Sequence, residues 1–238
     1  MAEPVDGEIF KSQQRKSAVE TVIETVRDLL LTRQLKRGDR LPNEMELTKK
    51  LSTSRGSIRE AMKILSSFGI VEIKRGDGTY ISHSMSNRLF DHLVFQLILS
   101  DADKKMLTEL REMTEIGIIK LVVANATDED IARIREEHAR MAESVDKGVS
   151  DAKALTELDL RFHLAVGRAT KNELIRKVYE VTLDLFAPSI EETHRRPDNS
   201  RNALRHHTNI LAGLEARDRD RAESAVRESI TQWAILSS

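Results

Sequence analysis

Apolar residues recur every three or four positions through most of the first 82 residues, and then alternate over a short final stretch. A three- to four-residue interval places side chains on one face of a helix, whereas alternation is typical of a strand. The intervals therefore predict three helices and a two-stranded hairpin, over residues 11–35, 44–51, 55–68, 70–73 and 79–81. The two strand segments flank Arg75-Gly76-Asp77-Gly78, whose glycines favour a tight turn.

The second and third predicted helices follow each other closely, and both carry helix-start signals. Asn43 is a good N-cap, and Glu46 three residues later completes a capping box. Ser54 or Thr53 can cap the third helix, which Gly69 ends as a left-handed cap. Two short helices that cross at a tight turn, followed by a hairpin, form the outline of a winged helix-turn-helix, which is a DNA-reading device.

Basic and small residues gather where such a device meets DNA. Arg55 and Arg59 are four residues apart, so both guanidinium groups project from one side of the third helix. Arginine binds guanine or phosphate, serine binds phosphate, and a glycine lets the backbone come close to DNA. The candidate DNA contacts are Ser54, Arg55, Gly56, Ser57, Arg59, Lys74, Arg75 and Gly76, the last three at the hairpin tip. The alternative is a small α+β subdomain with solvated surface charges.

From residue 87 onward the pattern is helix after helix, with no convincing strand. The expected helices span residues 89–98, 104–125, 131–147, 152–170, 172–193, 201–216 and 219–236. Pro197 and the polar residues 198–200 mark the one clear loop among the later ones. Amphipathic helices joined by short connections predict an antiparallel bundle.

The expected fold class is mainly α, with an N-terminal winged helix-turn-helix that carries a small β-hairpin wing and a C-terminal all-α antiparallel helical bundle. A short polar linker over residues 83–86 marks the domain boundary. We expect a DNA-binding domain over residues 11–82 and a helical effector-binding and dimerisation domain over residues 87–238. At 238 residues the chain is long enough for two small domains.

Composition and charge narrow the picture further. The chain has no cysteine, which excludes a disulfide framework and a thiolate metal site and fits a reducing cytosol. No apolar run approaches the length of a membrane span and the N-terminus lacks a signal-peptide core, so we expect a cytoplasmic protein without membrane contact. Residues 1–82 carry 15 Lys+Arg against 12 Asp+Glu, and the remainder carries 23 against 27. This mild basicity favours locally placed arginines in a dimer over strong non-specific DNA binding.

The stretch from Leu41 to Ile81 resembles the DNA-binding domain of the GntR regulators. The family pattern is met at Leu41-Pro42, Glu44, Glu46-Leu47, Leu51, Ser54-Arg55, Ile58-Arg59-Glu60-Ala61, Leu65, Gly69-Ile70-Val71 and Gly76-Asp77-Gly78-Thr79-Tyr80-Ile81. The resemblance implies that Arg55, Ser57 and Arg59 contact the operator, that the wing turn enters the minor groove, and that a homodimer reads a palindrome. The chain departs from the pattern at Met45, where many members carry arginine.

Residues 109–131 and 158–175 resemble two helices of the FCD domain, the effector-sensing bundle that marks the FadR subfamily of the GntR regulators. Arg111 matches a position from which the family reaches its effector pocket. A guanidinium group there can clamp a carboxylate through two hydrogen bonds. The alternative is a surface arginine between Glu109 and Glu115.

Asp159 and His163 are four residues apart on one helical face, which is a usable geometry for two ligands of one metal ion. Taken alone, such a pair is more often a solvated surface pair. The FCD resemblance implies that both are metal ligands, that His207 rather than His206 is the next one, and that the last histidine falls where this chain has Ser229. A hydroxyl is a poor ligand for a borderline divalent ion. Two hypotheses follow: three residues hold Zn²⁺, Ni²⁺ or Mn²⁺ with water or effector completing the site, or the site binds the effector directly.

His194, with Arg195 and Arg196, is interpreted as a solvated positive run near a loop that could help to select an anion. The candidate effector-binding residues are Arg111, Asp159, His163, His207 and Ser229. The sequence thus predicts a bacterial, ligand-responsive transcription regulator, a repressor that a sugar acid or other small organic acid releases from its operator.

Two other functions remain open from the sequence alone. A metal-dependent hydrolase or lyase could be built on the bundle, although the chain lacks a nucleophile motif, a phosphate-binding loop and HExxH. An architectural DNA binder without an effector would not need a bundle of this length. The two alternatives differ from a regulator in whether a ligand changes DNA affinity.

Overall fold

The computed structural model describes residues 16–83, 99 and 102–236. The chain divides into two compact units, Met1–Phe90 and Asp91–Ser238, referred to here as the N-terminal unit and the C-terminal unit. The start of the helix predicted over residues 11–35, the helix predicted over 89–98 and most of the predicted linker lie outside the described residues.

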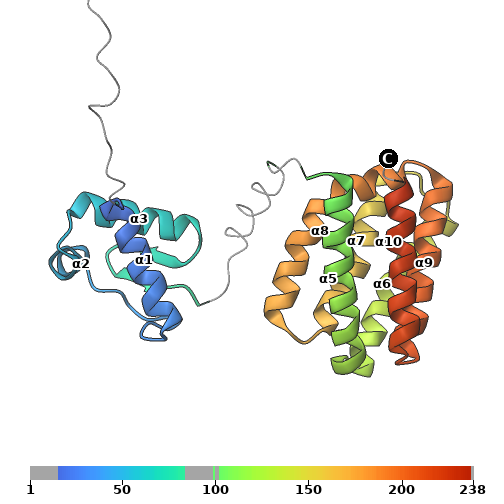
Figure 1. The fold of residues 1–238 in the computed structure, drawn as a ribbon, viewed down its shortest axis with the longest axis horizontal. Helices are drawn as coiled ribbons and strands as arrows, with labels where there is room; N and C mark the ends of the chain where they lie inside the picture. Colours follow the sequence, from blue (N-terminus) through green and yellow to red (C-terminus); the bar gives the residue numbers. More distant parts are fainter. Residues whose placement is uncertain (1–15, 84–98, 100–101, 237–238) are drawn as a thin grey trace, which may run out of the picture. The chain divides into compact units, whose positions relative to one another are not determined.

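The helices described in the N-terminal unit are α1 (Ala18–Leu31), α2 (Glu44–Leu51) and α3 (Arg55–Ser67) (Figure 1). Each begins at a side-chain cap, where Ser17, Asn43 or Ser54 accepts a backbone N–H of the first turn. The capping box of Asn43 with Glu46 is confirmed. α1 ends earlier than the sequence predicts, because Arg33 adopts a left-handed backbone with φ 58° that an α-helix cannot contain.

Strands β1 (Val71–Lys74) and β2 (Gly78–Ile81) form an antiparallel hairpin, in which Val71 lies opposite Ile81. The chain ahead of α2 joins this hairpin, since the N–H of Leu41 donates to the carbonyl of Thr79 at 2.8 Å. The helices and strands share one buried core, made of Val22, Val26, Leu41, Ile58, Ala61, Met62, Leu65, Val71 and Ile81. The predicted winged helix-turn-helix is confirmed.

The C-terminal unit is a helical bundle. Its described helices are α5 (Lys104–Asn125), α6 (Asp128–Asp146), α7 (Ala152–Ala169), α8 (Glu173–His194), α9 (Pro197–Glu215) and α10 (Arg219–Leu236). They run side by side, and the short connections reverse the chain between neighbours (Figure 1). α7 packs against α5, α6 and α8, while α10 packs against α5 and α9. The predicted all-α bundle is confirmed, and no described helix has an apolar stretch long enough to cross a membrane.

The prediction of a loop over residues 197–200 is wrong, because these residues form the first turn of α9. Pro197 occupies the first helical position, where a missing N–H costs no hydrogen bond. Asp198 adds a negative charge at the positive end of the helix dipole. The consequence is that Ser200 lies on a rigid helix and is buried, rather than in an exposed loop.

Candidate functional site

The exposed side of α3 carries the arginines that the sequence predicts to read DNA. Arg55, Gly56 and Arg59 are exposed in the first half of the helix. The hydroxyl of Ser54 accepts the backbone N–H of Ser57 at 3.0 Å and lies 2.9 Å from the Ser57 hydroxyl. Ser54 therefore caps the helix. The opposite side of α3 is buried through Ile58, Ala61, Met62 and Leu65, so the arginine side faces outward.

The two helices of the helix-turn-helix are joined by an ion pair. Nε of Arg59 on α3 donates to Oε2 of Glu44 on α2 at 2.7 Å. Met45, the next residue of α2, is 52% exposed. Its thioether side chain is apolar and lacks the charge that an arginine would bring at this position.

The wing has a braced tip. Lys74, Arg75 and Gly76 are exposed, and Gly76 has φ 77°, which favours glycine. The hydroxyl of Tyr80 donates to Oδ1 of Asp77 at 3.0 Å, while Nζ of Lys74 lies 4.9 Å from the Tyr80 ring centroid. These contacts hold the turn in one conformation, so the basic tip is presented without a large loss of conformational freedom on binding.

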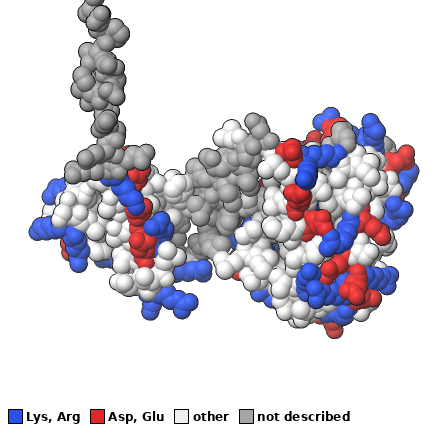
Figure 2. Space-filling view, viewed as in Figure 1, with Lys and Arg blue, Asp and Glu red and all other residues white. Residues whose placement is uncertain are grey.

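Acidic residues distinguish α1 from the side of α3 that carries the exposed arginines. All three acidic residues of α1, Glu20, Glu24 and Asp28, follow at four-residue intervals, and Figure 2 shows an acidic stripe over this helix. DNA is a polyanion, so this stripe repels it. The basic residues of α3 and of the wing are then the surface that suits a DNA backbone.

Buried polar side chains from five helices surround a cavity of about 40 Å³ inside the C-terminal unit, called here the polar cavity. It is lined by Arg111, Asp159, Ile190, Thr193, His194, Asn199, Asn202, Ala203, His206, His207, Ser229, Gln232, Trp233 and Leu236. Seven buried side-chain atoms in or beside it have no hydrogen-bond partner among the described residues: Nη1 of Arg111, Oδ1 of Asp159, Nε2 of His163, both ring nitrogens of His206, Nδ1 of His207 and Nε1 of Trp233. Buried polar atoms are normally paired, so this cluster indicates a ligand site.

Asp159, His163 and His207 are brought together as the sequence predicts. Each offers one ligand atom, and the three atoms lie within 4.8 Å of one another. Oδ1 of Asp159 is 3.4 Å from Nε2 of His163. Two atoms that bind one ion at about 2.0–2.1 Å are roughly 3–3.5 Å apart, so this pair already has suitable spacing. Neither atom has a hydrogen-bond partner among the described residues, so no such bond must be broken before they bind an ion.

Neighbouring side chains hold the two histidine rings. The hydroxyl of Tyr179 on α8 lies 2.9 Å from Nδ1 of His163, which turns Nε2 toward Asp159. The ring of Phe162 stacks on His207 with centroids 4.1 Å apart. Fixed rings reduce the reorganisation that metal binding would otherwise require.

Burial and the neighbouring imidazoles set the charges at this site. Burial alone raises the pKa of Asp159, but the adjacent His207, His194 and His163 outweigh it, and the pKa ends well below the ordinary value. Burial lowers the pKa of His207 to about 3, and the nearby Asp159 only partly opposes the shift. At neutral pH the site therefore contains a carboxylate and a neutral imidazole, which are the protonation states that a metal ion binds.

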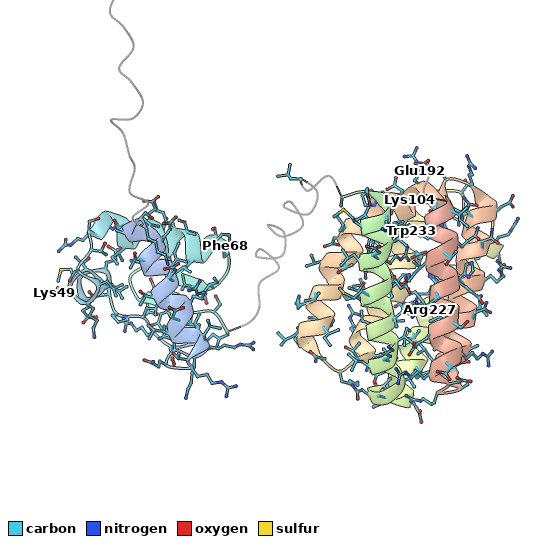
Figure 3. All side chains as sticks on the ribbon, viewed as in Figure 1. Lys49, Phe68, Lys104, Glu192, Arg227 and Trp233 are labelled. Atoms are coloured by element: carbon cyan, nitrogen blue, oxygen red, sulfur yellow. The ribbon has the colours of Figure 1, made fainter. Side chains whose placement is uncertain are left out.

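Arg111 lies inside the bundle, so the interpretation as a surface arginine is wrong. It is 3% exposed, and its Nε donates to Oε1 of Glu115 at 2.9 Å. Its guanidinium carbon lies 4.7 Å from the ring centroid of Trp233, which Figure 3 shows between α5 and α10. Burial lowers the pKa of Arg111, but Glu115 outweighs it and raises the pKa, so the group stays charged. Nη1 remains for an anion.

Two family models match the chain. The model described as "Bacterial regulatory proteins, gntR family" matches residues 18–81, and the FCD domain model matches residues 106–232. The chain belongs to the GntR family. It is therefore a transcription regulator with an FCD effector domain, and not an enzyme.

This GntR-family chain is similar to named regulators and to a solved structure. It is 29% identical over 203 residues to the HTH-type transcriptional regulator LutR of Bacillus subtilis, covering 83% of this chain and 91% of LutR. It is 28% identical over 193 residues to the galactonate operon transcriptional repressor of Escherichia coli, a match that covers 79% of this chain and 82% of that repressor. The structure of Streptococcus agalactiae GntR covers 91% of this chain and 99% of its own at a TM-score of 0.61 and 24% identity, which shows a shared fold.

Several cavity residues of this regulator were missed by the sequence analysis. His194 is only 1% exposed, so its interpretation as part of a solvated run is wrong. Its spacing in the sequence could have predicted its burial: His194 lies four residues after Ile190 and eight after Phe186, both on the buried stripe of α8. His206 and Trp233 also line the cavity. The predicted Ser229 is half-buried in the cavity wall.

Proposed function

We propose that this regulator is a cytoplasmic repressor that binds a palindromic operator as a homodimer and is released from it by a small carboxylate. The observation that carries the proposal is the polar cavity in the FCD domain, whose unpaired atoms include Nη1 of a buried arginine and ligand atoms for a metal ion. On the DNA side, support comes from the exposed Arg55 and Arg59 of α3 and from the basic wing tip with Lys74 and Arg75. The named relative that represses a galactonate operon supports both repression and a sugar-acid effector.

Asp159, His163 and His207 are the proposed metal ligands. One carboxylate and two imidazoles suit borderline divalent ions such as Zn²⁺, Ni²⁺ or Mn²⁺. Ser229 supplies only a hydroxyl from α10, so a position remains for water or for the effector. A bound ion would supply a Lewis-acidic centre for an effector carboxylate.

Arg111 is the proposed anchor for the same carboxylate. Its Nη1 is unpaired among the described residues, and Glu115 holds the rest of the guanidinium in place. An arginine restrained in this way loses little freedom when it binds a carboxylate. His206 and Trp233, which also have unpaired nitrogen atoms, are available for the hydroxyl groups of a sugar acid.

The size of the polar cavity suggests how binding is coupled to DNA release. A cavity of about 40 Å³ holds an ion with a few waters. A sugar acid is larger, so it must widen the cavity and displace the helices that line it. The effector then favours a bundle conformation different from the one without effector, and its differential affinity shifts the dimer away from the DNA-bound arrangement.

An exposed apolar groove supports the homodimer. It lies between α5 and α8 and is lined by Thr114, Gly117, Ile118, Leu121, Leu174, Ile175, Val178 and Tyr179. Leu174 is 64% exposed and Val178 is 54% exposed, which is unfavourable for a monomer in water. The uncharged area over α5 and α8 is visible in Figure 2. A two-fold contact on this face would bury both copies of the groove.

The proposal is tested with His207→Ala, using an operator obtained by selection from random DNA and a screen of sugar acids and other organic acids with Zn²⁺, Ni²⁺ or Mn²⁺. We expect the wild-type chain to gain thermal stability from an acid in the presence of metal and to release the operator. His207→Ala should bind the operator normally and respond to neither metal nor acid. His138→Ala, which removes another imidazole of the bundle, is the matched control. A His207→Ala protein that releases DNA normally would disprove the site assignment.

A further inference from the structure

We infer that His194 is a positioning residue for the proposed metal centre: with Ser200 it forms a hydrogen-bonded relay that fixes the carboxylate of Asp159 for a divalent cation. The inference rests on the proposed metal site and adds a part of it that the ligand pattern does not contain. The relay joins three helices, because Asp159 lies on α7, His194 ends α8 and Ser200 lies in the first turn of α9.

The geometry of the relay is complete. Nε2 of His194 lies 3.1 Å from Oδ2 of Asp159, and Nδ1 of His194 lies 3.0 Å from Oγ of Ser200. The three side chains are buried, with exposures of 4% for Asp159, 1% for His194 and 3% for Ser200. Hydrogen bonds to a buried carboxylate are strong, because water does not compete for the acceptor.

The protons of the relay can be assigned from its acceptors. An ionised Asp159 can only accept, so Nε2 of His194 must donate its N–H to Oδ2. In the tautomer that carries its proton on Nε2, Nδ1 accepts the O–H of Ser200. Ser200 thus selects the tautomer of His194, and His194 selects which oxygen of Asp159 is occupied.

The free oxygen is the one the metal site needs. Oδ1 of Asp159 has no partner among the described residues and lies 3.4 Å from Nε2 of His163, the other candidate ligand atom. Without His194, either carboxylate oxygen of Asp159 could face the metal ion. The Asp159 side chain could also rotate away from His163. Outer partners of this type usually strengthen metal binding by about 10- to 100-fold.

The test compares metal affinity in full-length variants. Zn²⁺ dissociation constants are measured by competition with a chromophoric chelator, and the visible spectrum of bound Co²⁺ reports the ligand set. We expect His194→Ala to weaken Zn²⁺ binding by about 10- to 100-fold. His194→Gln, whose amide can donate to Oδ2, should restore affinity to within a few fold and leave the Co²⁺ spectrum unchanged. Ser200→Ala should cause a smaller loss of Zn²⁺ affinity. The His194 ring is still present in this variant, but the hydrogen bond that selects its tautomer is missing.

Thr208→Ala is the matched control, because the Thr208 hydroxyl is bonded to an imidazole, Nε2 of His138 at 2.9 Å, that is not a proposed ligand. It should bind Zn²⁺ like the wild type. If His194→Ala fails to fold, as judged by its thermal transition, the Zn²⁺ affinities of Ser200→Ala and His194→Gln are compared with that of the wild type instead.

Two results would overturn the inference while leaving the metal site in place. One is wild-type affinity in both His194→Ala and Ser200→Ala. The other is an equal loss in His194→Gln and His194→Ala with an altered Co²⁺ spectrum, which would make His194 a direct ligand. A wild-type chain that binds none of the ions would instead remove the proposed metal centre, and the relay's role with it.

Discussion

Arg59 of α3 and Glu44 of α2 meet at 2.7 Å on the exposed side of the helix-turn-helix, with side chains that are 65% and 43% exposed. An exposed pair of this kind contributes little to folding, about 0–1 kcal/mol. Its importance is geometric. Because Glu44 engages Nε, the two terminal nitrogens of Arg59 remain for a base or phosphate, and the side chain is partly ordered before DNA arrives.

The first prediction concerns this arginine. Arg59→Ala should weaken binding to the selected operator by about 1–3 kcal/mol, the amount expected for one bidentate contact to a base. Arg59→Lys should recover little of it, since lysine cannot form two parallel hydrogen bonds. Fluorescence anisotropy with labelled operator measures both.

Arg27→Ala is the control, because Arg27 is also exposed and paired with an adjacent carboxylate, Asp28 at 3.0 Å, but lies on the acidic α1. It should leave operator affinity unchanged. Wild-type affinity in Arg59→Ala would show that α3 does not read the operator through this residue.

The second prediction concerns the buried pair of Arg111 and Glu115, whose side chains are 4% and 3% exposed. Arg111→Ala should lower the free energy of unfolding by about 3–5 kcal/mol, because it deprives the buried carboxyl group of Glu115 of the guanidinium that donates to it. Replacing both residues by methionine should recover most of the loss, since apolar side chains of similar size need no partner. Urea unfolding measures the two variants.

The double variant separates stability from recognition. It should fold and bind Zn²⁺, but an acid that stabilises the wild type should no longer raise its melting temperature. If the acid stabilises both proteins equally, Arg111 is a structural ion-pair partner and not the effector anchor.

The winged helix could be predicted closely because its signals are local. The capping box of Asn43 and Glu46 and the cap at Ser54 depend on residues three positions apart, and both were found from the sequence. The pair of Asp159 and His163 was found for the same reason, since four residues on a helix fix their common face.

The cavity wall could not be predicted in this way, because its contacts join distant segments. His194 contacts Asp159, which lies 35 positions earlier in the sequence. Helical periodicity predicts which side of α8 is buried, but it does not identify the residues that this side contacts. The error at Pro197 had a related effect, because a loop was expected where α9 begins and Ser200 was left out of the site.

The third prediction is a pH dependence at Asp130. This carboxylate accepts hydrogen bonds from the backbone N–H of Thr127 at 2.8 Å and from Nζ of Lys171 at 2.7 Å. Burial raises the pKa of Asp130, but these partners outweigh it and the pKa is lower in the folded chain than its ordinary value of 3.8. A depressed carboxyl pKa stabilises the fold above pH 3.8, and the contribution is lost as the pH falls through the folded pKa.

Asp130→Asn should therefore lower the free energy of unfolding by about 2 kcal/mol at pH 7, the usual size for a hydrogen bond to a charged group. The difference from wild type should shrink below pH 3.8. Urea unfolding at pH 7 and pH 3 tests the sign. Asp146→Asn, at an exposed position on the same helix, should show no such change. A constant difference at both pH values would mean that charge is not the cause.

The fourth prediction concerns the close approach of α9 and α10, two helices that line the polar cavity. A Cβ added to Gly213 would lie 2.7 Å from the Cα of Ala222 and 2.8 Å from its backbone nitrogen. Backbone atoms cannot rotate away, so Gly213→Ala must push the helices apart, and overpacking of this kind costs about 1–3 kcal/mol. Ser224→Ala on α10 is the control, because Ser224 is exposed on the same helix pair. The control should be neutral or gain a few tenths of a kcal/mol from helix propensity. Thermal and urea unfolding of the two variants test this prediction. Equal stability would show that the two helices can separate at Gly213 without cost.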